Sequence, residues 1–267
     1  MRALISGRLC GPLAAGLLCL AAGCDLGLPG EGPRGEGPGG RRQPLALSPQ
    51  EELAVGRKAF REVLQEYRGR ILPENQRDSV RVRRVVDRLA KAAEIEPLQR
   101  EIHLRIEGYV FDWEVAVIQE RQVNAFCLPA GKMVVFTAIL PVAANDDQLA
   151  TVLSHEMAHA LAHHGSERVA REQSGGGGIL RSLRYDRFQE SEADHIGVFL
   201  MAFAGYDPDA AAEFWLRMRR YIGDGGTPEI LSDHPSHETR IRDLRRWAPR
   251  ARAAKQAYDE GRVLQSK

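Results

Sequence analysis

The sequence has 267 residues, with 37 Lys and Arg against 36 Asp and Glu, and its formal net charge at pH 7 is +1. Proteins that bind nucleic acid usually carry a clear basic excess, so this balance argues against a nucleic-acid partner. A hydrophobic fraction of 43% with 27% charged residues is typical of a globular chain and excludes a largely disordered one. Four cysteines are too few for a disulfide scaffold.

The N-terminus has the three parts of a secretory signal peptide. Arg2 and Arg8 form a basic region, residues 9–22 are apolar or small, and Cys24 follows shortly after. This ending resembles a bacterial lipobox, which implies cleavage before Cys24 and lipidation of that cysteine. We therefore expect residues 1–23 to be a lipoprotein signal peptide and the lipid to anchor the protein to a membrane of the bacterial cell envelope, facing the periplasm. An ordinary cleaved signal and an uncleaved anchor are the alternatives, although the apolar run of about 14 residues is short of the roughly 20 that span a bilayer.

The composition divides the rest of the chain into three parts. Residues 24–47 begin with the lipidated cysteine and are rich in Gly, Pro and Arg, which is typical of a flexible linker because such a segment buries little apolar surface. A folded domain is expected over residues 48–250, and residues 251–267 are expected to form a C-terminal tail. Cys127, within this domain, is expected to be a small core residue.

Helical and strand patterns follow one another along the domain. Ser48, Pro49 and Glu51 form a capping box with proline at the first helical position, which predicts a helix over residues 49–67. Alternating apolar residues between 101 and 137, including Ile102, Leu104 and Ile106, predict three or four short strands with a turn at 129–132. The fold class is therefore α+β: mainly helical, with a small and mostly antiparallel sheet. Further helices are expected over 76–93, 145–164, 186–204, 208–222 and 236–247.

The expected helix over 145–164 contains the sequence His155-Glu156-Met157-Ala158-His159. Histidines at positions i and i+4 lie on one helical face, roughly 6 Å apart, and their ring nitrogens can converge on one Zn²⁺. Glu156 stands where its carboxylate can reach a metal-bound water without binding the metal itself. The motif therefore predicts His155 and His159 as zinc ligands and Glu156 as catalytic base. An amphipathic helix with two incidental histidines is the alternative.

A third ligand must come from another segment. His163 is excluded because it lies roughly 12 Å along the helix axis from His155, whereas two ligands of one zinc ion are only about 4 Å apart. We expect His163 and the neighbouring His164 to serve the C-terminal turn of their helix, where positive charge is favourable.

The better candidate is on the expected helix over 186–204. Glu190 and Asp194 are spaced i and i+4, so Glu190 can face the metal while Asp194 accepts a hydrogen bond from a ligand imidazole. Glu192 is about 200° around the same helix and is expected to face elsewhere. A charged, solvent-facing helix is the alternative, but apolar residues such as Phe199 indicate that this helix packs in the core.

These two motifs resemble the HExxH…ExxxD arrangement of the gluzincin metallopeptidases. The resemblance is to the family that contains HtpX, the CAAX prenyl endopeptidases and the BepA-type periplasmic proteases, and segments 124–131, 204–208 and 234–236 agree with it. It extends over about residues 48–248. It implies a zincin-type metalloprotease domain with one Zn²⁺ per chain, held by His155, His159 and Glu190, and it implies protein or peptide substrates.

The resemblance also implies roles for residues outside the two motifs. His234 and Arg240 match a His-Pro…Arg element near the site, where such a histidine stabilises the developing oxyanion or occupies the open zinc position as a self-inhibitory switch. A histidine that only fixes its loop is the alternative. Asn124, Ala125 and Phe126 resemble an edge strand beside the cleft, to which a substrate could add as a further strand.

The sequence thus predicts a zinc-dependent endopeptidase of the bacterial cell envelope that acts in quality control of misfolded or unassembled proteins. Two alternatives stay open. One is a lipid-tethered chaperone or binding protein with a structural zinc, and the other is an autoinhibited protease that needs a regulatory protein partner. Transmembrane helices like those of HtpX are not evident in the sequence, so processing of prenylated substrates is not expected.

Overall fold

The computed structural model describes residues 41–104, 106–175, 187–223, 230, 234 and 238–262. The expected signal peptide, the lipidation site Cys24 and the linker up to residue 40 lie outside the described residues. The same holds for residues 235–237, where the last helix was expected to begin, and for most of the glycine run at 175–178.

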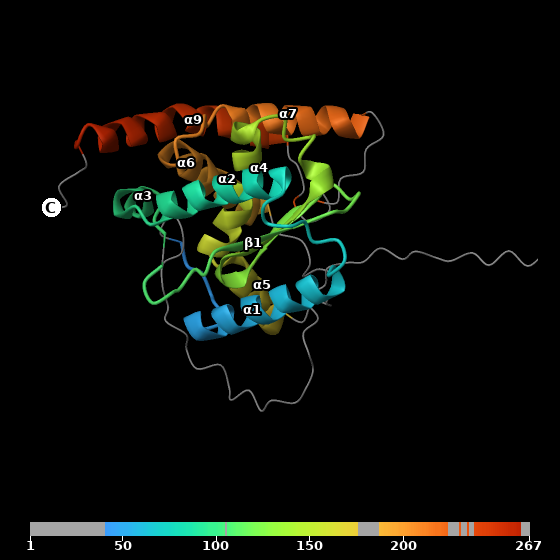
Figure 1. Cartoon of the computed structure of the whole chain (residues 1–267). Helices are drawn as coiled ribbons and strands as arrows, with labels where there is room; N and C mark the ends of the chain where they lie inside the picture. Colours follow the sequence, from blue (N-terminus) through green and yellow to red (C-terminus); the bar gives the residue numbers. More distant parts are fainter. Residues whose placement is uncertain are drawn as a thin grey trace, which may run out of the picture.

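Helices lie on both sides of a small sheet (Figure 1). Five predicted helices are confirmed to within a few residues at either end. These helices are α1 (Pro49–Glu66), α2 (Arg77–Ala93), α4 (Asp146–Leu161), α6 (Arg187–Phe203) and α7 (Ala210–Gly223). The capping box of α1 is present, since Ser48 Oγ accepts from the Glu51 backbone N–H and the Glu51 carboxylate accepts from the Ser48 N–H.

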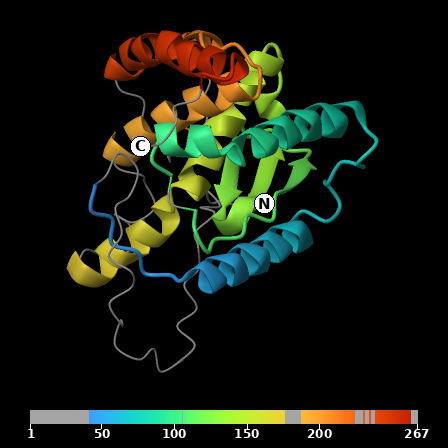
Figure 2. The same cartoon turned by 90° about the vertical axis from the view of Figure 1, so that its left-hand side faces the viewer.

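The sheet is mixed, not mostly antiparallel. Its order is β1 (Glu114–Ile118), β3 (Lys132–Phe136), β2 (Ala125–Leu128), with β1 parallel and β2 antiparallel to β3. The chain reverses between β1 and β2 and again between β2 and β3, as alternating strands predict, so β3 has the same direction as β1. Because β3 lies between the other two strands, it pairs with β1 as a parallel neighbour. The turn before β3 is the 3₁₀ segment η2 (Pro129–Gly131). Figure 2 shows the sheet lying between α1 and α2.

The predicted strand over residues 102–106 is wrong. Helix α3 (Glu96–Glu101) occupies the preceding segment, and Ile102 is its C-cap residue. Leu98 and Ile102 are four residues apart on one helical face and both are buried, so Ile102 continues a helical spacing. His103 then has a φ of 51°, which ends any regular element. Three alternating apolar residues are too few to distinguish the period of a strand from that of a helix.

Two helices differ from the prediction in extent or existence. Helix α5 (His164–Gly175) follows α4 in a stretch for which the sequence predicts no helix, and His163 separates the two with a φ of 53°. Helix α9 (Glu238–Asp259) extends beyond residue 247, through Pro249. Its later turns also pack, because Ala251 is buried and the ring of Tyr258 lies 5.6 Å from that of Phe203. Residues 251–259 therefore belong to the packed structure.

The segment of residues 41–47, which we call the strap, packs against the helices although the sequence predicts a linker there. Gln43 is 3% exposed, and its Nε2 donates to the backbone oxygen of Ala162 at 2.6 Å. The Leu47 backbone N–H donates to Ser166 Oγ at 2.9 Å. Composition does not reveal these contacts, since polar side chains make them.

Helix α4 is the centre of the core. Every residue from Gln148 to Leu161 is buried, and α2, α6, α7 and β2 all pack against this helix. A helix covered on all sides can hold charged side chains only where partners meet them, which makes its polar residues the natural place to look for a site. Among the described residues, no helix combines the length and the apolar character needed to cross a membrane.

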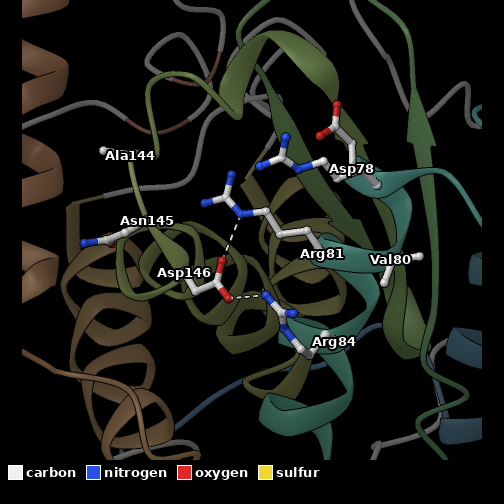
Figure 3. A pocket seen from close by; sticks show the side chains of 8 residues that line it. Asp78, Val80, Arg81, Arg84, Ala144, Asn145 and Asp146 are labelled. Atoms are coloured by element: carbon white, nitrogen blue, oxygen red, sulfur yellow. Dashed lines mark hydrogen bonds and ion pairs between the residues drawn. The ribbon is translucent and has the colours of Figure 1, made fainter.

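A pocket of about 740 Å³ lies between the first turns of α2 and α4 (Figure 3). Asp146 projects from α4 into it and accepts hydrogen bonds from Arg81 Nε at 2.8 Å and from Arg84 Nη2 at 2.5 Å. Because Asp146 pairs with both Arg81 and Arg84, these contacts hold α2 against the N-terminus of the buried helix.

Candidate metal centre

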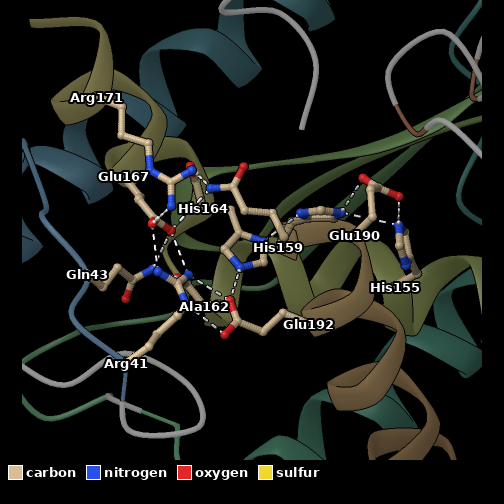
Figure 4. Close-up of polar contacts among 11 residues, drawn as sticks. Arg41, Gln43, His155, His159, Ala162, His164, Glu167, Arg171, Glu190 and Glu192 are labelled. Carbon is tan, nitrogen blue, oxygen red and sulfur yellow. Dashed lines mark hydrogen bonds and ion pairs between the residues drawn. The ribbon is translucent and has the colours of Figure 1, made fainter. Parts of the chain in front are cut away.

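Three elements bring the predicted site residues together. Helix α4 contributes His155, Glu156 and His159, and α6 contributes Glu190, while His234 comes from the chain between α7 and α9. Each of these residues is at most 3% exposed. Potential ligand atoms of His155, His159, Glu190 and His234 all lie within 4.8 Å of one another. Figure 4 shows that Glu190 lies between the two histidines of α4.

The nearest distances between these residues, with a different Glu190 oxygen nearest to each histidine, are close to those between ligands of one tetrahedral metal. Ligands that each lie about 2.0–2.1 Å from a tetrahedral Zn²⁺ are roughly 3.3 Å from one another. His155 Nε2 is 3.2 Å from His159 Nε2 and 3.4 Å from Glu190 Oε2, and His159 Nε2 is 3.5 Å from Glu190 Oε1. Two imidazoles and a carboxylate are also an ordinary zinc donor set. The residues therefore fit the ion that the sequence predicts.

His234 lies next to the same arrangement. Its Nδ1 is 3.3 Å from His155 Nε2 and 2.8 Å from Glu190 Oε1. Its Nε2 is 3.4 Å from Glu156 Oε1. His234 is thus placed between the predicted base and the predicted ligands, where it can occupy the position that a catalytic zinc site leaves open.

Asp194 stands behind His155, on the side away from the cluster. Its Oδ1 is 3.0 Å from His155 Nδ1, the arrangement that the i and i+4 spacing predicts. Arg240 Nη2 donates to the same oxygen at 2.6 Å, and its guanidinium lies 3.5 Å from the ring centroid of Trp215. Arg240 also contacts Glu190 through Nη1, at 3.4 Å. A catalytic role for Arg240, which with His234 matches an element near the site, stays a prediction.

The charges of the cluster favour a bound cation. Burial alone would lower the pKa of His155, but its contacts with Asp194 and Glu190 outweigh that effect and raise this pKa to about 9. Burial lowers the pKa of His159 well below its usual value. Although burial opposes it, the neighbouring His234 and His155 hold the pKa of Glu190 well below its usual range. A metal ion would take the place of the proton that the carboxylates of Asp194 and Glu190 otherwise favour on His155.

Strand β2 lies beside the predicted base. Burial and the charge of nearby Glu156 raise the pKa of the Cys127 thiol well above its usual value. Asn124 and Ala125 are buried, and the Asn124 backbone oxygen accepts from Phe136 N–H at 3.0 Å. Phe126 is half-buried and packs edge-on against Phe136. The side chains predicted to bind substrate thus belong largely to the sheet, and β2 is at its edge.

Sequence reasoning missed a second set of residues around His159. His164 Nδ1 lies 2.8 Å from His159 Nδ1, and Glu192 Oε2 lies 2.9 Å from His164 Nε2. Glu192 faces away from Glu190, as its position around the helix predicts, but it faces this histidine. The signal in the sequence is a histidine five positions after His159, which becomes meaningful only with the break of the helix at His163.

His163 has a separate environment despite its position next to His164. Its Nδ1 lies 3.0 Å from Glu52 Oε2 of α1, and its ring lies against the ring of Tyr109 in a tilted arrangement, at a centroid distance of 3.7 Å. It is 2% exposed. The prediction that both histidines serve the helix terminus is therefore incomplete, since each is paired with a carboxylate from a different element.

Comparison with known proteins agrees with this geometry. A family model described as Peptidase family M48 matches residues 76–177 and 176–248. The chain is 34% identical over 231 residues to the mitochondrial metalloendopeptidase OMA1 of Schizosaccharomyces pombe and 30% identical over 229 residues to that of Saccharomyces cerevisiae. These matches cover 78% and 75% of this chain and 64% of each relative.

A more distant match is the putative beta-barrel assembly-enhancing protease of Vibrio cholerae, 27% identical over 163 residues, which covers 49% of this chain and 34% of the relative. The chain therefore spans less than two thirds of the length of these relatives. The family model nevertheless matches most of the folded part of the chain, and the predicted metallopeptidase class is confirmed. The chain belongs to peptidase family M48.

Proposed function

We propose that the protein is a zinc-dependent endopeptidase. The observation that carries this proposal is the spacing of 3.2–3.5 Å between potential ligand atoms of His155, His159 and Glu190, with Glu156 directly after His155 in α4. Family membership supports the same activity. Zinc, when bound, supplies a Lewis acid and lowers the pKa of a coordinated water.

The residues of the chain account for the remaining steps. Glu156 would accept a proton from the attacking water and pass it to the leaving amine, which requires a carboxylate that is close to the metal but does not bind it. His155 is held by Asp194, so its Nε2 lone pair stays directed at the cluster. Because these side chains are buried, they would act in surroundings where electrostatic interactions are strong.

Proteolysis measured together with zinc content tests this function. The full chain should degrade an unfolded protein substrate and contain about one zinc per chain. Removal of zinc with a chelator should abolish degradation, and addition of zinc should restore it. Stoichiometric zinc with no degradation under any condition would instead favour a binding protein with a structural zinc.

We further propose that substrates bind as an extended segment along β2. The strand is at the edge of the sheet and next to Glu156, so a peptide that paired with it would pass close to the predicted base. Such binding recognises main chain more than sequence, which suits quality control of misfolded proteins.

The lipobox-like N-terminus supports a lipid-anchored protein of the bacterial cell envelope. Metabolic labelling with a lipid precursor, compared between the wild type and Cys24→Ala, tests the anchor.

One observation favours a second form of this function, an autoinhibited protease. His234 Nδ1 lies 2.8 Å from Glu190 Oε1 and 3.3 Å from His155 Nε2, close enough to support the proposal that it takes the open position of the metal. In that position it would exclude water from the metal. A regulatory partner or a substrate would then have to move the His234 side chain before hydrolysis begins.

A further inference from the structure

We propose that His164 and Glu192 form a positioning relay for His159, and that Arg41 of the strap holds this relay in place. This inference rests on the zinc site proposed above and deepens it. Neither His164 nor Glu192 is among the potential ligands of the cluster, so both would act through His159.

The relay is continuous from the cluster to the strap (Figure 4). His159 Nε2 points to the cluster, and its other ring nitrogen, Nδ1, lies 2.8 Å from His164 Nδ1. His164 Nε2 in turn lies 2.9 Å from Glu192 Oε2. His164 has no exposed surface, so water cannot replace either contact at little cost.

The chemistry of the contacts fixes the direction of every hydrogen bond. If His159 binds a metal through Nε2, its proton must be on Nδ1, and it must donate to His164 Nδ1. His164 then carries its own proton on Nε2 and donates it to the carboxylate of Glu192. Both histidines are neutral in this arrangement, and each is confined to one tautomer and one ring orientation.

The two metal-binding histidines of α4 are thus supported in different ways. His155 contacts the carboxylate of Asp194 directly, at 3.0 Å, whereas His159 reaches a carboxylate only through His164. Both carboxylates come from α6, two residues apart, and an arginine binds each of them. Asp194 is bound by Arg240 and Glu192 by Arg41.

Arg41 binds two carboxylates at once. Its Nη2 is 2.7 Å from Glu192 Oε2, and its Nη1 is 2.6 Å from Glu167 Oε1. The side chain of Glu167 has no exposed surface, and that of Glu192 is 9% exposed. Without the guanidinium these two buried charges would repel each other, so displacement of the strap should loosen Glu192 and, through it, His164.

The decisive experiment measures zinc affinity of the full chain by competition with a chelator. In His164→Leu, the His159 Nδ1–H loses its acceptor, and zinc affinity should fall by about 10–100-fold, as is usual when a residue that supports a metal ligand is lost. His164→Gln should recover most of this loss, because its amide oxygen can accept from His159 and its amide N–H can donate to Glu192. Arg41→Gln should weaken zinc binding in the same direction.

His163→Leu is the matched control. It removes a buried histidine at the neighbouring position whose carboxylate partner, Glu52, lies on α1. The melting temperature of the zinc-free protein should fall, while zinc affinity stays within about threefold of the wild type. If His164→Leu binds zinc as tightly as the wild type, or if His163→Leu weakens zinc binding as much, the relay is wrong. A wild type that binds no zinc would overturn the proposed function itself.

A second measurement does not depend on a folded leucine variant. In the zinc-loaded wild type, nitrogen-15 NMR of the histidine side chains should give His159 and His164 as single tautomers, protonated at Nδ1 and Nε2 respectively. Both ring protons should exchange slowly with water. In Arg41→Gln, exchange should become faster for both residues and remain unchanged for His163. The opposite tautomers, or equal exchange in both proteins, would contradict the relay.

Discussion

Gly197 of α6 lies against Ser154 of α4 so closely that a Cβ on the glycine would be 3.1 Å from Ser154 Oγ. Its other near neighbours are backbone atoms, including the nitrogen of His155 at 3.3 Å. This approach allows two buried helices to lie near enough for short carboxylate side chains to reach the imidazoles. A larger residue at 197 would push α6 away from α4. It would thereby move Glu190 away from His155 and His159 without contacting the side chains of these predicted ligands.

Glu156→Gln should retain zinc and lose proteolysis. The amide has nearly the same shape but cannot accept a proton from water, so kcat should fall by about 10²–10⁴-fold. Zinc content by mass spectrometry and degradation of an unfolded substrate measure the two properties. Proteolysis at the wild-type rate would remove Glu156 from the mechanism.

His234→Ala should increase proteolysis, because it opens the fourth position of the cluster. We expect a gain in kcat/KM of about tenfold or more, which corresponds to an inhibitory contact of about 1.4 kcal/mol. Zinc content should stay at the wild-type level, since His155, His159 and Glu190 remain. A decrease in activity with zinc retained would instead assign His234 to stabilisation of the oxyanion.

Glu190→Ala should lower zinc stoichiometry more than Glu192→Ala. Glu190 lies within 3.5 Å of both His155 Nε2 and His159 Nε2, whereas Glu192 contacts His164. The first variant loses a ligand and the second only weakens the support of one. Zinc content after dialysis against zinc-free buffer measures the difference, and the reverse ranking would mean that the wrong carboxylate was assigned to the metal.

Gly56→Ala should destabilise the fold. A Cβ at Gly56 of α1 would lie 1.9 Å from the backbone oxygen of Pro129, so α1 would have to move away from the turn before β3. We expect a loss of about 1–3 kcal/mol in the free energy of unfolding, measured with urea. Gly69→Ala is the control, because no atom lies within 4 Å of its added Cβ. An equal effect of the two substitutions would show that the contact is not responsible.

Stability should fall in acid partly through Glu167. Burial would raise the pKa of this residue, but its bonds to Arg41 and Gln43 outweigh burial and lower the pKa to about 2, from 4.5. Because the folded pKa is the lower one, Glu167 stabilises the protein above pH about 4.5, and this contribution is lost as pH falls toward 2. The difference in unfolding free energy between wild type and Glu167→Gln should therefore shrink between pH about 5 and about 3. A constant difference would contradict it.

The sequence predictions are correct where a short local pattern by itself determines the structure. The capping box at Ser48 starts a helix at the expected residue, and the i and i+4 spacing puts Glu190 and Asp194 on the face toward α4. The failures come from tertiary contacts. The packing of the strap depends on Gln43 meeting a backbone oxygen of another element, and the role of His164 depends on a positive φ at the preceding residue.

The length of β2 limits how many residues of a substrate the proposed enzyme would bind as an added strand. Ala125–Leu128 offers four residues of sheet edge, which at about 3.3 Å per residue is roughly 13 Å of main chain. A partner for such a short edge needs only four or five consecutive residues in extended form. Local fraying of a substrate would therefore suffice for cleavage, and a protein with one loosened loop could be cut while the rest of it remained folded.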